Sequence, residues 1–394
     1  MNEGARSQRR AVRRARARRR RRTAVLSVTV VLLAVAGSLY VVYGRGGSAA
    51  DAAGPAHPTA TGPAAAGHAS DQPKKPVRST APAEPSGTLT LAFAGDVHFT
   101  GRTAGRLTAD PALGPMAKTL SAADFAMVNL ESAITTRGTE EAKLYHFRTT
   151  PAALTALQHS GIDAVTMANN HSVDYGPQGL ADSIAAKRAS PIPVVGIGAD
   201  DTEAYRPYTT KINGVRLAVV GASQIYDLTN ANFRAGPGRP GIASALDRAK
   251  LLSVVRQAKT EADVVVVYLH WGIEGESCPT ADQKSIAADL SAAGATAVVG
   301  THAHVMLGSG MLGPTYVGYG FGNFLWYGTS PYPHSDETGV TTLTVTHGKV
   351  AHAVFTPAVV DGQGIPEPQS GAAARQITDR YGQLHQCTGL TEAP

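Results

Sequence analysis

Short apolar segments alternate with longer amphipathic segments over most of the chain after residue 87. The apolar segments are four to seven residues long, rich in Val, Leu and Ala, and typical of buried strands. We expect strands at 88–94, 125–130, 164–167, 193–197, 217–221, 264–269, 296–300, 316–319, 341–345 and 351–355. We expect helices between them at 151–159, 179–189, 244–259 and 280–293. This alternation predicts an α/β fold, and the last two strands, joined around Gly348, predict an antiparallel hairpin.

Residues 1–86 follow a different pattern, which we divide into three segments. Residues 1–22 hold eleven Arg and one Glu, and residues 24–43 hold no charge. At 1.5 Å per residue, a helix over 24–43 would span the ~30 Å hydrocarbon layer of a bilayer. Residues 44–86 are rich in Ala, Pro and Gly, which predicts a disordered linker.

The charge pattern sets the expected topology. We expect residues 1–23 to be a cytoplasmic tail, residues 24–43 a single-pass membrane anchor, and the rest to lie outside the cell. A cleaved secretory signal is the alternative, but the apolar run is longer than a typical signal core and no small-residue site closes it. Both interpretations place residues 87–394 outside.

Composition narrows the class of protein. With 394 residues, 43% of them hydrophobic and 17% charged, the chain has material for a large core and is not a disordered chain or a coiled coil. A formal net charge of +6 would by itself suggest a nucleic-acid partner. However, residues 1–22 alone carry +10, so the remainder is left with −4 and we expect no nucleic-acid partner. In an oxidising exterior, Cys278 and Cys387 are expected to form a disulfide, with two unpaired thiols as the alternative.

Polar side chains that can bind metals follow five of the predicted strands directly. They are Asp96 and His98, then Asn129 and Glu131, then Asn169, Asn170 and His171, then His270, and finally His302 and His304. Because the carboxyl ends of strands in an α/β fold form an edge where ligands bind, we expect these side chains to lie close together. A lone His after a strand is usually structural, but five such segments favour one shared site.

A divalent metal centre explains this set. Imidazole, carboxylate and amide oxygen together suit Mn, Zn, Fe or Co. The number of donors favours two adjacent ions, with Asp96 or Glu131 as the carboxylate shared between them. Such a pair can activate water and clamp a displacement at phosphorus. His171, next to the candidate ligand Asn170, is placed to act as a general acid.

In their order along the chain, these motifs resemble the calcineurin-like metallophosphoesterase superfamily and, within it, the CapA-type poly-γ-glutamate capsule biosynthesis family. The resemblance covers residues 88–360 and rests on Gly95-Asp96, Val128-Asn-Leu-Glu131, 168–176, His270-Trp-Gly-Ile-Glu274, 287–290 with Gly300-Thr-His-Ala-His304, and 319–325. It implies a four-layer α/β/β/α sandwich over residues 87–389, followed by a short tail at 390–394.

By position, the resemblance also implies a set of site residues. It implies His171 as the acid and two metal ions held by Asp96, His98, Glu131, Asn170, His270, His302 and His304. The superfamily usually offers an Asp where this chain has Glu131, which is longer by one methylene. For substrate binding the candidates are Asn129, Arg148 and Asn323, although Arg148 could equally form an ordinary surface ion pair. Asp174 either orients His171 or caps the following helix.

The resemblance finally implies a role at the outer face of the cell membrane. We expect the domain to help make, export or attach an anionic polymer such as poly-γ-glutamate, with capsule synthetase membrane subunits as candidate partners. The chemistry would be hydrolysis or transfer at a phosphate ester or at the γ-amide. A secreted metal-dependent phosphatase or nucleotidase is the first alternative, and a non-catalytic capsule-assembly partner is the second.

Overall fold

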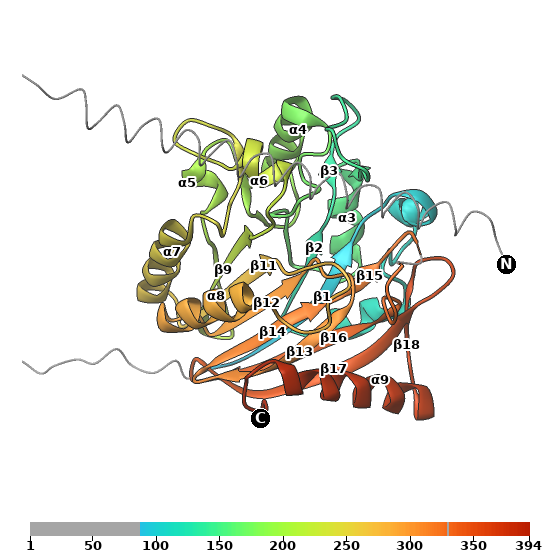
Figure 1. Cartoon of the computed structure of the whole chain (residues 1–394), viewed down its shortest axis with the longest axis vertical. Helices are drawn as coiled ribbons and strands as arrows, with labels where there is room; N and C mark the ends of the chain where they lie inside the picture. Colours follow the sequence, from blue (N-terminus) through green and yellow to red (C-terminus); the bar gives the residue numbers. More distant parts are fainter. Residues whose placement is uncertain (1–86, 329–330) are drawn as a thin grey trace, which may run out of the picture. The chain divides into compact units, whose positions relative to one another are not determined.

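Two β-sheets stacked face to face form the centre of the structure, a computed structural model that describes residues 87–328 and 331–394 (Figure 1). The expected tail, anchor and linker at residues 1–86 lie outside the described residues. Within the part that is described, no helix combines the length and the apolar character needed to cross a membrane.

The first sheet contains the N-terminal strand of the domain in its interior. Its strands are β1 (Thr88–Val97), β2 (Phe125–Leu130), β5 (Ala164–Thr166), β6 (Val194–Val195), β15 (Asn323–Leu325), β16 (Glu337–Thr346), β17 (Lys349–Val360) and β18 (Pro366–Pro368). They are ordered β18-β17-β16-β1-β2-β5-β6, and β15 also pairs with β1. Strands β1, β2, β5 and β6 are parallel, whereas β16 and β17 form the expected antiparallel hairpin. Its turn holds His347 and Gly348 at φ of 52° and 71°, as a two-residue hairpin turn requires.

The second sheet is also mainly parallel. Its strands are β8 (Tyr208–Ile212), β9 (Val215–Ser223), β11 (Val264–His270), β12 (Ala297–Thr301), β13 (Met306–Leu312) and β14 (Thr315–Phe321). They are ordered β13-β14-β12-β11-β9-β8, with antiparallel strands at both edges. Two short two-stranded sheets join β3 (Ala133–Ile134) to β4 (Arg148–Thr149) and β7 (Ile197–Gly198) to β10 (Gly241–Ile242).

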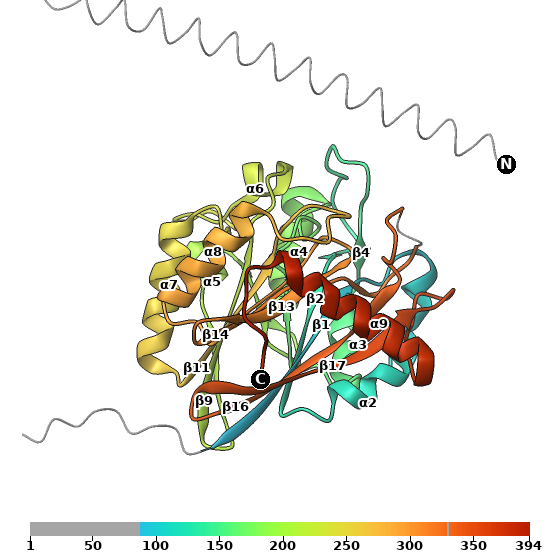
Figure 2. The same ribbon diagram turned by 60° about the horizontal axis from the view of Figure 1, so that its bottom comes forward.

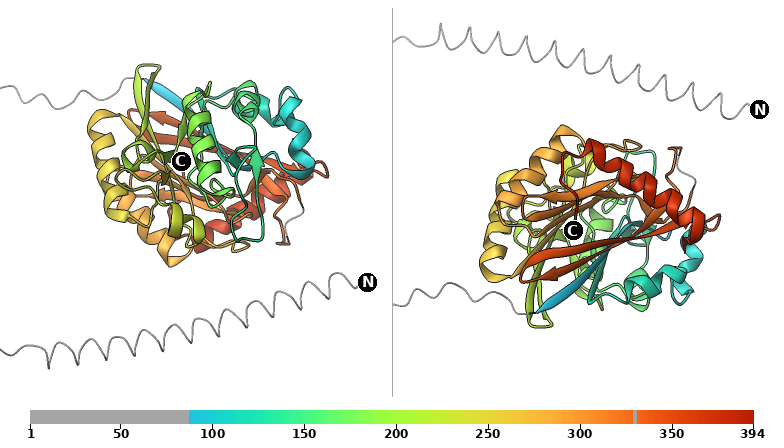
Figure 3. Two further views of the ribbon diagram at one scale, coloured as in Figure 1. Left: turned by 90° about the horizontal axis from the view of Figure 1, so that it is seen from above. Right: turned by 90° about the horizontal axis from the view of Figure 1, so that it is seen from below.

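Helices cover the outer face of each sheet. The first sheet packs against α2 (Ala117–Leu120), α3 (Ala152–His159) and α4 (Gly176–Arg188), and the second against α7 (Arg248–Glu261) and α8 (Ala281–Ala292). A third core, which includes Phe93, Val266 and Tyr268, fills the space between the sheets. Because both faces of the central strands are buried, these strands read as continuous apolar runs in the sequence. The predicted α/β fold is confirmed, and its layers are helix, sheet, sheet, helix (Figure 3).

The described part of the chain contains six further helices, most of them short. They are η1 (Gly101–Thr108), η2 (Gly114–Met116), α5 (Asp201–Ala204), α6 (Leu228–Phe233), α9 (Gly371–Leu384) and η3 (His385–Cys387). Helix α9 lies against β13 and β17 (Figure 2). The expected disulfide between Cys278 and Cys387 is present and joins η3 to the loop that follows β11. Residues 390–394, expected as a tail, lie against the domain, because Thr391 pairs with Met311 in β13.

Candidate metal centre

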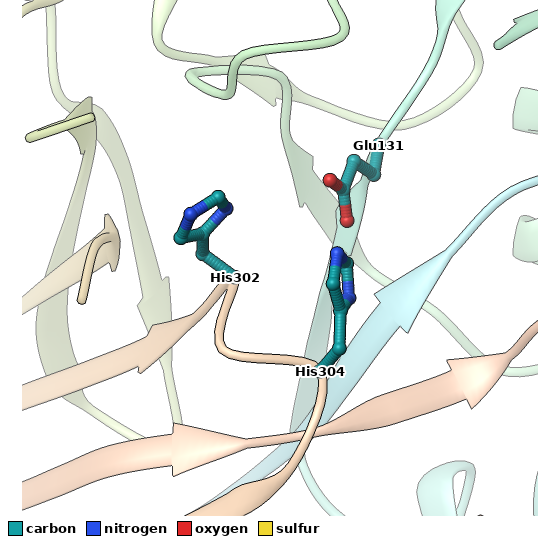
Figure 4. A group of neighbouring side chains, drawn as sticks. All are labelled: Glu131, His302 and His304. Carbon is teal, nitrogen blue, oxygen red and sulfur yellow. The ribbon is translucent and has the colours of Figure 1, made fainter. Parts of the chain in front are cut away.

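The carboxyl ends of strands from both sheets meet at the candidate site. Asp96 of β1 is in register with Asn129 of β2, and His270 of β11 is in register with Thr301 of β12. After β12 the chain turns through His302 and His304, whose φ angles of 99° and 56° are uncommon for residues other than glycine. The same turn carries both imidazoles, and Figure 4 shows the Glu131 carboxylate facing the ring of His304, with His302 beside them.

Among the described residues, two overlapping groups of side chains could hold a metal ion. The first consists of Glu131, His302 and His304, and the second of Asp96, Glu131 and His270. All five residues are buried, and within each group the candidate ligand atoms lie within 4.8 Å of one another. Glu131 is common to both groups, so a shared carboxylate can join two adjacent ions at this position.

Glu131 is the side chain whose surroundings point most directly to a cation. Its two carboxylate oxygens are buried and have no hydrogen-bond partner in the described part of the chain. Burial raises the pKa of Glu131 well above its usual range, and the neighbouring Asp96 carboxylate raises that pKa further. A buried carboxylate without a partner is costly, and a divalent cation would satisfy both oxygens. The donors around Glu131, which are imidazoles and another carboxylate, therefore fit a divalent metal.

Two imidazoles of the site, those of His270 and His302, are held in the form that binds metals. Burial lowers the pKa of His270 and that of His302 well below the usual value, and neighbouring histidines lower both further. Both rings are therefore neutral at physiological pH, as a metal ligand must be. Nε2 of His270 lies 2.7 Å from Oδ1 of Asn170 and 3.6 Å from Oε1 of Glu131, so the structure brings Asn170 to the same centre.

Asn129 orients other site residues through both ends of its amide. Its Nδ2 donates to Oδ1 of Asp96 at 2.8 Å, and its Oδ1 accepts from Nδ2 of Asn169 at 2.9 Å. Both ends of the Asn129 amide are therefore hydrogen-bonded to other residues of the protein. Burial raises the pKa of Asp96, and the charge of His304 and the bond from Asn129 oppose that rise.

His171 forms a buried pair with Asp174. Its Nδ1 lies 2.7 Å from Oδ2 of Asp174, and its Nε2 lies 3.8 Å from Oε1 of Glu131, so one nitrogen is anchored and the other faces the metal groups. Burial lowers the pKa of His171, whereas Asp174 opposes that shift. Helix α4 has Tyr175 at its N-cap and receives no side-chain capping bond, so Asp174 orients His171 and does not cap the helix.

His98 lies outside both candidate groups. Its ring nitrogens face the backbone N–H groups of Thr100 at 3.1 Å and Tyr327 at 3.3 Å, and its ring stacks on Phe147. The pairing of β1 shifts register between Asp96 and Val97. Such a bulge interrupts the alternation that would direct side chains two residues apart to the same face. The structure therefore gives His98 a different environment from Asp96.

The other two substrate-binding candidates have different surroundings. Asn323 is buried, and its Oδ1 lies 2.9 Å from Nδ1 of His304, so it is in a position to orient that ring. Arg148 is exposed, and its guanidinium carbon lies 4.5 Å from the centre of the Tyr175 ring, a cation–π contact.

Sequence reasoning missed two polar residues that support the site. Thr301 places its Oγ1 3.1 Å from Nδ1 of His270, and Lys143 donates to Oδ1 of Asp174 at 2.6 Å. Thr301 could have been found, because it directly precedes His302 at the end of a strand. No sequence pattern pointed to Lys143, because it lies in a polar loop that has no periodicity.

Comparison with known sequences gives a consistent family match. The sequence model of the family described as "Bacterial capsule synthesis protein PGA_cap" matches residues 90–327. The PGA biosynthesis protein CapA of Bacillus subtilis is 30% identical over 245 residues, which cover 60% of this chain and 63% of that protein. The capsule biosynthesis protein CapA of Bacillus anthracis is 31% identical over 188 residues, which cover 47% of this chain and 45% of that protein. The chain thus spans about half to three fifths of the length of these relatives.

Solved structures show only a distant likeness. A hypothetical protein from Thermus thermophilus has a TM-score of 0.42 at 17% identity, with 68% of this chain and 98% of that chain covered. The sulfate thiohydrolase SoxB from the same organism has a TM-score of 0.40 at 14% identity, covering 75% and 60%. A 5'-nucleotidase from Candida albicans has a TM-score of 0.39 at 10% identity, covering 75% and 58%.

Proposed function

Because the chain belongs to the bacterial capsule synthesis family PGA_cap, we propose that it acts in the synthesis, export or attachment of a poly-γ-glutamate-type capsule polymer through a metal-dependent hydrolase or transferase site. Two relatives of about 30% identity are named as PGA and capsule biosynthesis proteins, which supports a role in making the capsule polymer. The observation that carries the metal site is the buried Glu131 carboxylate, which is common to two ligand groups and receives no hydrogen bond from the described residues.

The proposed site holds two divalent ions of Mn, Zn, Fe or Co type. Asp96, His270 and Asn170 would hold one ion and His302 and His304 the other, and Glu131 belongs to both candidate groups. When bound, the ions supply Lewis-acid polarisation of the substrate and an activated water. Asn129 and Asn323 are assigned to orientation of Asp96 and His304, because their amides are bonded to these residues. His98 is left out of the ligand set, because both of its ring nitrogens face backbone donors.

His171 is the proposed general acid. Its Nδ1 is held by Asp174, so the proton that it gives up must leave from Nε2, the nitrogen that faces Glu131. The Asp174 carboxylate stabilises the imidazolium form, which is the form that donates a proton. The stacking of His171 on Phe147, with ring centres 4.1 Å apart, fixes the plane of the ring. His171 would protonate the oxygen or nitrogen that leaves a phosphate ester or a γ-amide.

The location we propose is the outer face of the cell membrane. Residues 24–43 would anchor the chain, residues 1–23 would stay in the cytoplasm, and the linker 44–86 would carry the domain outward, where it meets the polymer and the membrane subunits of a capsule synthetase. The disulfide between Cys278 and Cys387 supports an oxidising environment.

The test separates the metal ligands from the acid. His171→Ala should keep its metal but lose roughly 10²- to 10⁴-fold in rate on substrates with poor leaving groups, and much less on nitrophenyl esters. The control is His159→Ala, which removes an exposed histidine at the end of α3. The measurements are metal stoichiometry and turnover of phosphate esters and γ-glutamyl amides. Full metal loading of the wild type without turnover of either substrate class would reject the enzymatic function.

A further inference from the structure

Lys143 reaches the candidate site from the loop between β3 and β4. Its side chain is only 15% exposed, although the next residues in the loop, Leu144 and Tyr145, are 82% and 56% exposed. Because its neighbours in the loop are exposed, Lys143 is not buried simply by its position in the chain. Lysine is rarely buried unless it is paired, so the partners of Lys143 show what holds it in place.

Lys143 binds one residue from each half of the site. Its Nζ donates to Oδ1 of Asp174 at 2.6 Å and also to the backbone carbonyl of Asn170. Asp174 belongs to the proposed acid pair, and Asn170 belongs to the proposed metal ligands. One ammonium group thus connects the acid to the metal centre.

The Asp174 carboxylate is held on both of its oxygens. Oδ2 accepts from Nδ1 of His171 and from the backbone N–H of Phe147, each at 2.7 Å, while Oδ1 accepts from Lys143. Asp174 is fully buried. Loss of the Lys143 ammonium would leave Oδ1 without this donor, and the carboxylate could then turn away from His171.

The Asn170 main chain is held from two sides. Its carbonyl accepts from Lys143 and from Oγ1 of Thr229, the latter at 2.7 Å. Lys143 lies in the loop between β3 and β4, whereas Thr229 lies in helix α6. Together they fix the backbone from which the Asn170 side chain points to Nε2 of His270. A shift of this backbone would move the amide oxygen that is proposed to bind the metal.

We propose that Lys143 is a positioning residue that sets the geometry of the acid pair and of the metal ligand Asn170 at the same time. It belongs to neither candidate ligand group and acts through Asp174 and Asn170. Its effect on rate rests on the proposed function, whereas its effect on metal affinity can be measured without any turnover.

The test compares three variants of the full chain in detergent. Lys143→Met removes the ammonium and keeps the length of the side chain, and Lys143→Arg keeps the charge and the donors. Lys187→Met is the matched control, because Lys187 in α4 is 16% exposed, donates to the carbonyl of Ile197 and lies beside the Glu203 carboxylate. Mn²⁺ affinity is measured by titration calorimetry, thermal unfolding reports the fold, and rates are measured on phosphate esters with good and poor leaving groups.

The expected result is a loss in both measurements for Lys143→Met. Mn²⁺ affinity should fall about 10- to 100-fold, as is typical when a residue behind a ligand is removed. The rate on poor leaving groups should fall about 10-fold more than the rate on good ones, because the proton donor is displaced. Lys143→Arg should lie closer to the wild type both in Mn²⁺ affinity and in the rate on poor leaving groups.

Two results would overturn the proposal. If Lys143→Met matches Lys187→Met in Mn²⁺ affinity, Lys143 does not position Asn170. If its rate loss is the same for all leaving groups, Lys143 does not position the acid. A wild type that binds Mn²⁺ and turns over no ester or γ-amide would reject the proposed function alone, and the calorimetric comparison would still decide the role of Lys143 at Asn170.

Discussion

Replacement of Glu131 by Gln should stabilise the metal-free protein. Glu131 is fully buried, and neither carboxylate oxygen has a hydrogen-bond partner among the described residues. An unsatisfied buried polar group costs about 1–3 kcal/mol, and more if it is charged. Gln has nearly the same shape and is equally unsatisfied, but it removes the charge. The extra cost of the charge is of the same order, so we expect the free energy of unfolding to rise by about 1–3 kcal/mol at pH 8 without metal. With a urea m-value of about 3 kcal/mol/M, the midpoint rises by roughly 0.3–1 M.

The size of this difference should depend on pH in a defined direction. Because burial raises the pKa of Glu131, the folded protein binds a proton that the unfolded chain releases above its usual pKa of 4.5. Wild-type stability therefore falls as the pH rises through the raised pKa. The gap between Glu131→Gln and the wild type should be widest at pH 8, shrink toward pH 5 and disappear below about pH 4.5.

Metal should reverse the order of stability. Mn²⁺ at 100 times its dissociation constant would stabilise the wild type by about 2.7 kcal/mol, and should not stabilise Glu131→Gln because the shared carboxylate is gone. The assay is urea unfolding with EDTA and with Mn²⁺, and the control is Glu140→Gln, whose side chain is 61% exposed. A metal-free Glu131→Gln protein that is no more stable than the wild type at pH 8 would refute the reasoning, since Glu131 would then have a partner in the metal-free state.

Three further outcomes are expected. His302→Ala should lose metal content and activity together, measured by elemental analysis beside turnover, and retention of full metal content would exclude His302 as a ligand. Replacement of Cys278 and Cys387 by Ser should lower the free energy of unfolding by up to about 4–5 kcal/mol because the disulfide closes a long loop, which urea unfolding measures; unchanged stability would contradict this. Protease added to intact protoplasts should remove the domain that begins at Gly87, and complete protection would rule out the proposed topology.

Much of the candidate metal centre could be predicted because its residues follow strands. Strand β2 has the predicted bounds, and Glu131 comes directly after it. Parallel strands with both faces buried give continuous apolar runs, so their carboxyl ends, and the polar residues there, are visible in the sequence. The common edge of the sheets then brings Asp96, His270 and His302 together without further information.

The residues that could not be predicted depend on loops and irregular backbone. The register shift after Asp96 gives His98 an environment that strict alternation does not predict. Lys143 reaches Asp174 from a loop without periodicity, and only the folded chain shows that they meet. Helix α9 was missed because its sequence is polar and only Ile377 is buried. The local pattern of apolar and polar residues indicates which segments are buried. The positions of His98, Lys143 and helix α9 depend instead on tertiary contacts, which that pattern does not contain.

The position of β1 inside the first sheet has a consequence for how the protein folds. Residues at the start of β1 pair with the end of β16, and the hydroxyls of Thr88 and Thr346 lie in contact although 258 residues separate them. Pairing over such a distance makes folding slow, because the loop must close before the contact forms. Until β16 is synthesised, this side of β1 is an unpaired edge that can associate with other chains. A chain truncated before Glu337 should therefore aggregate, and a domain that crosses the membrane from residue 87 onward would stay unfolded until almost all of it has crossed.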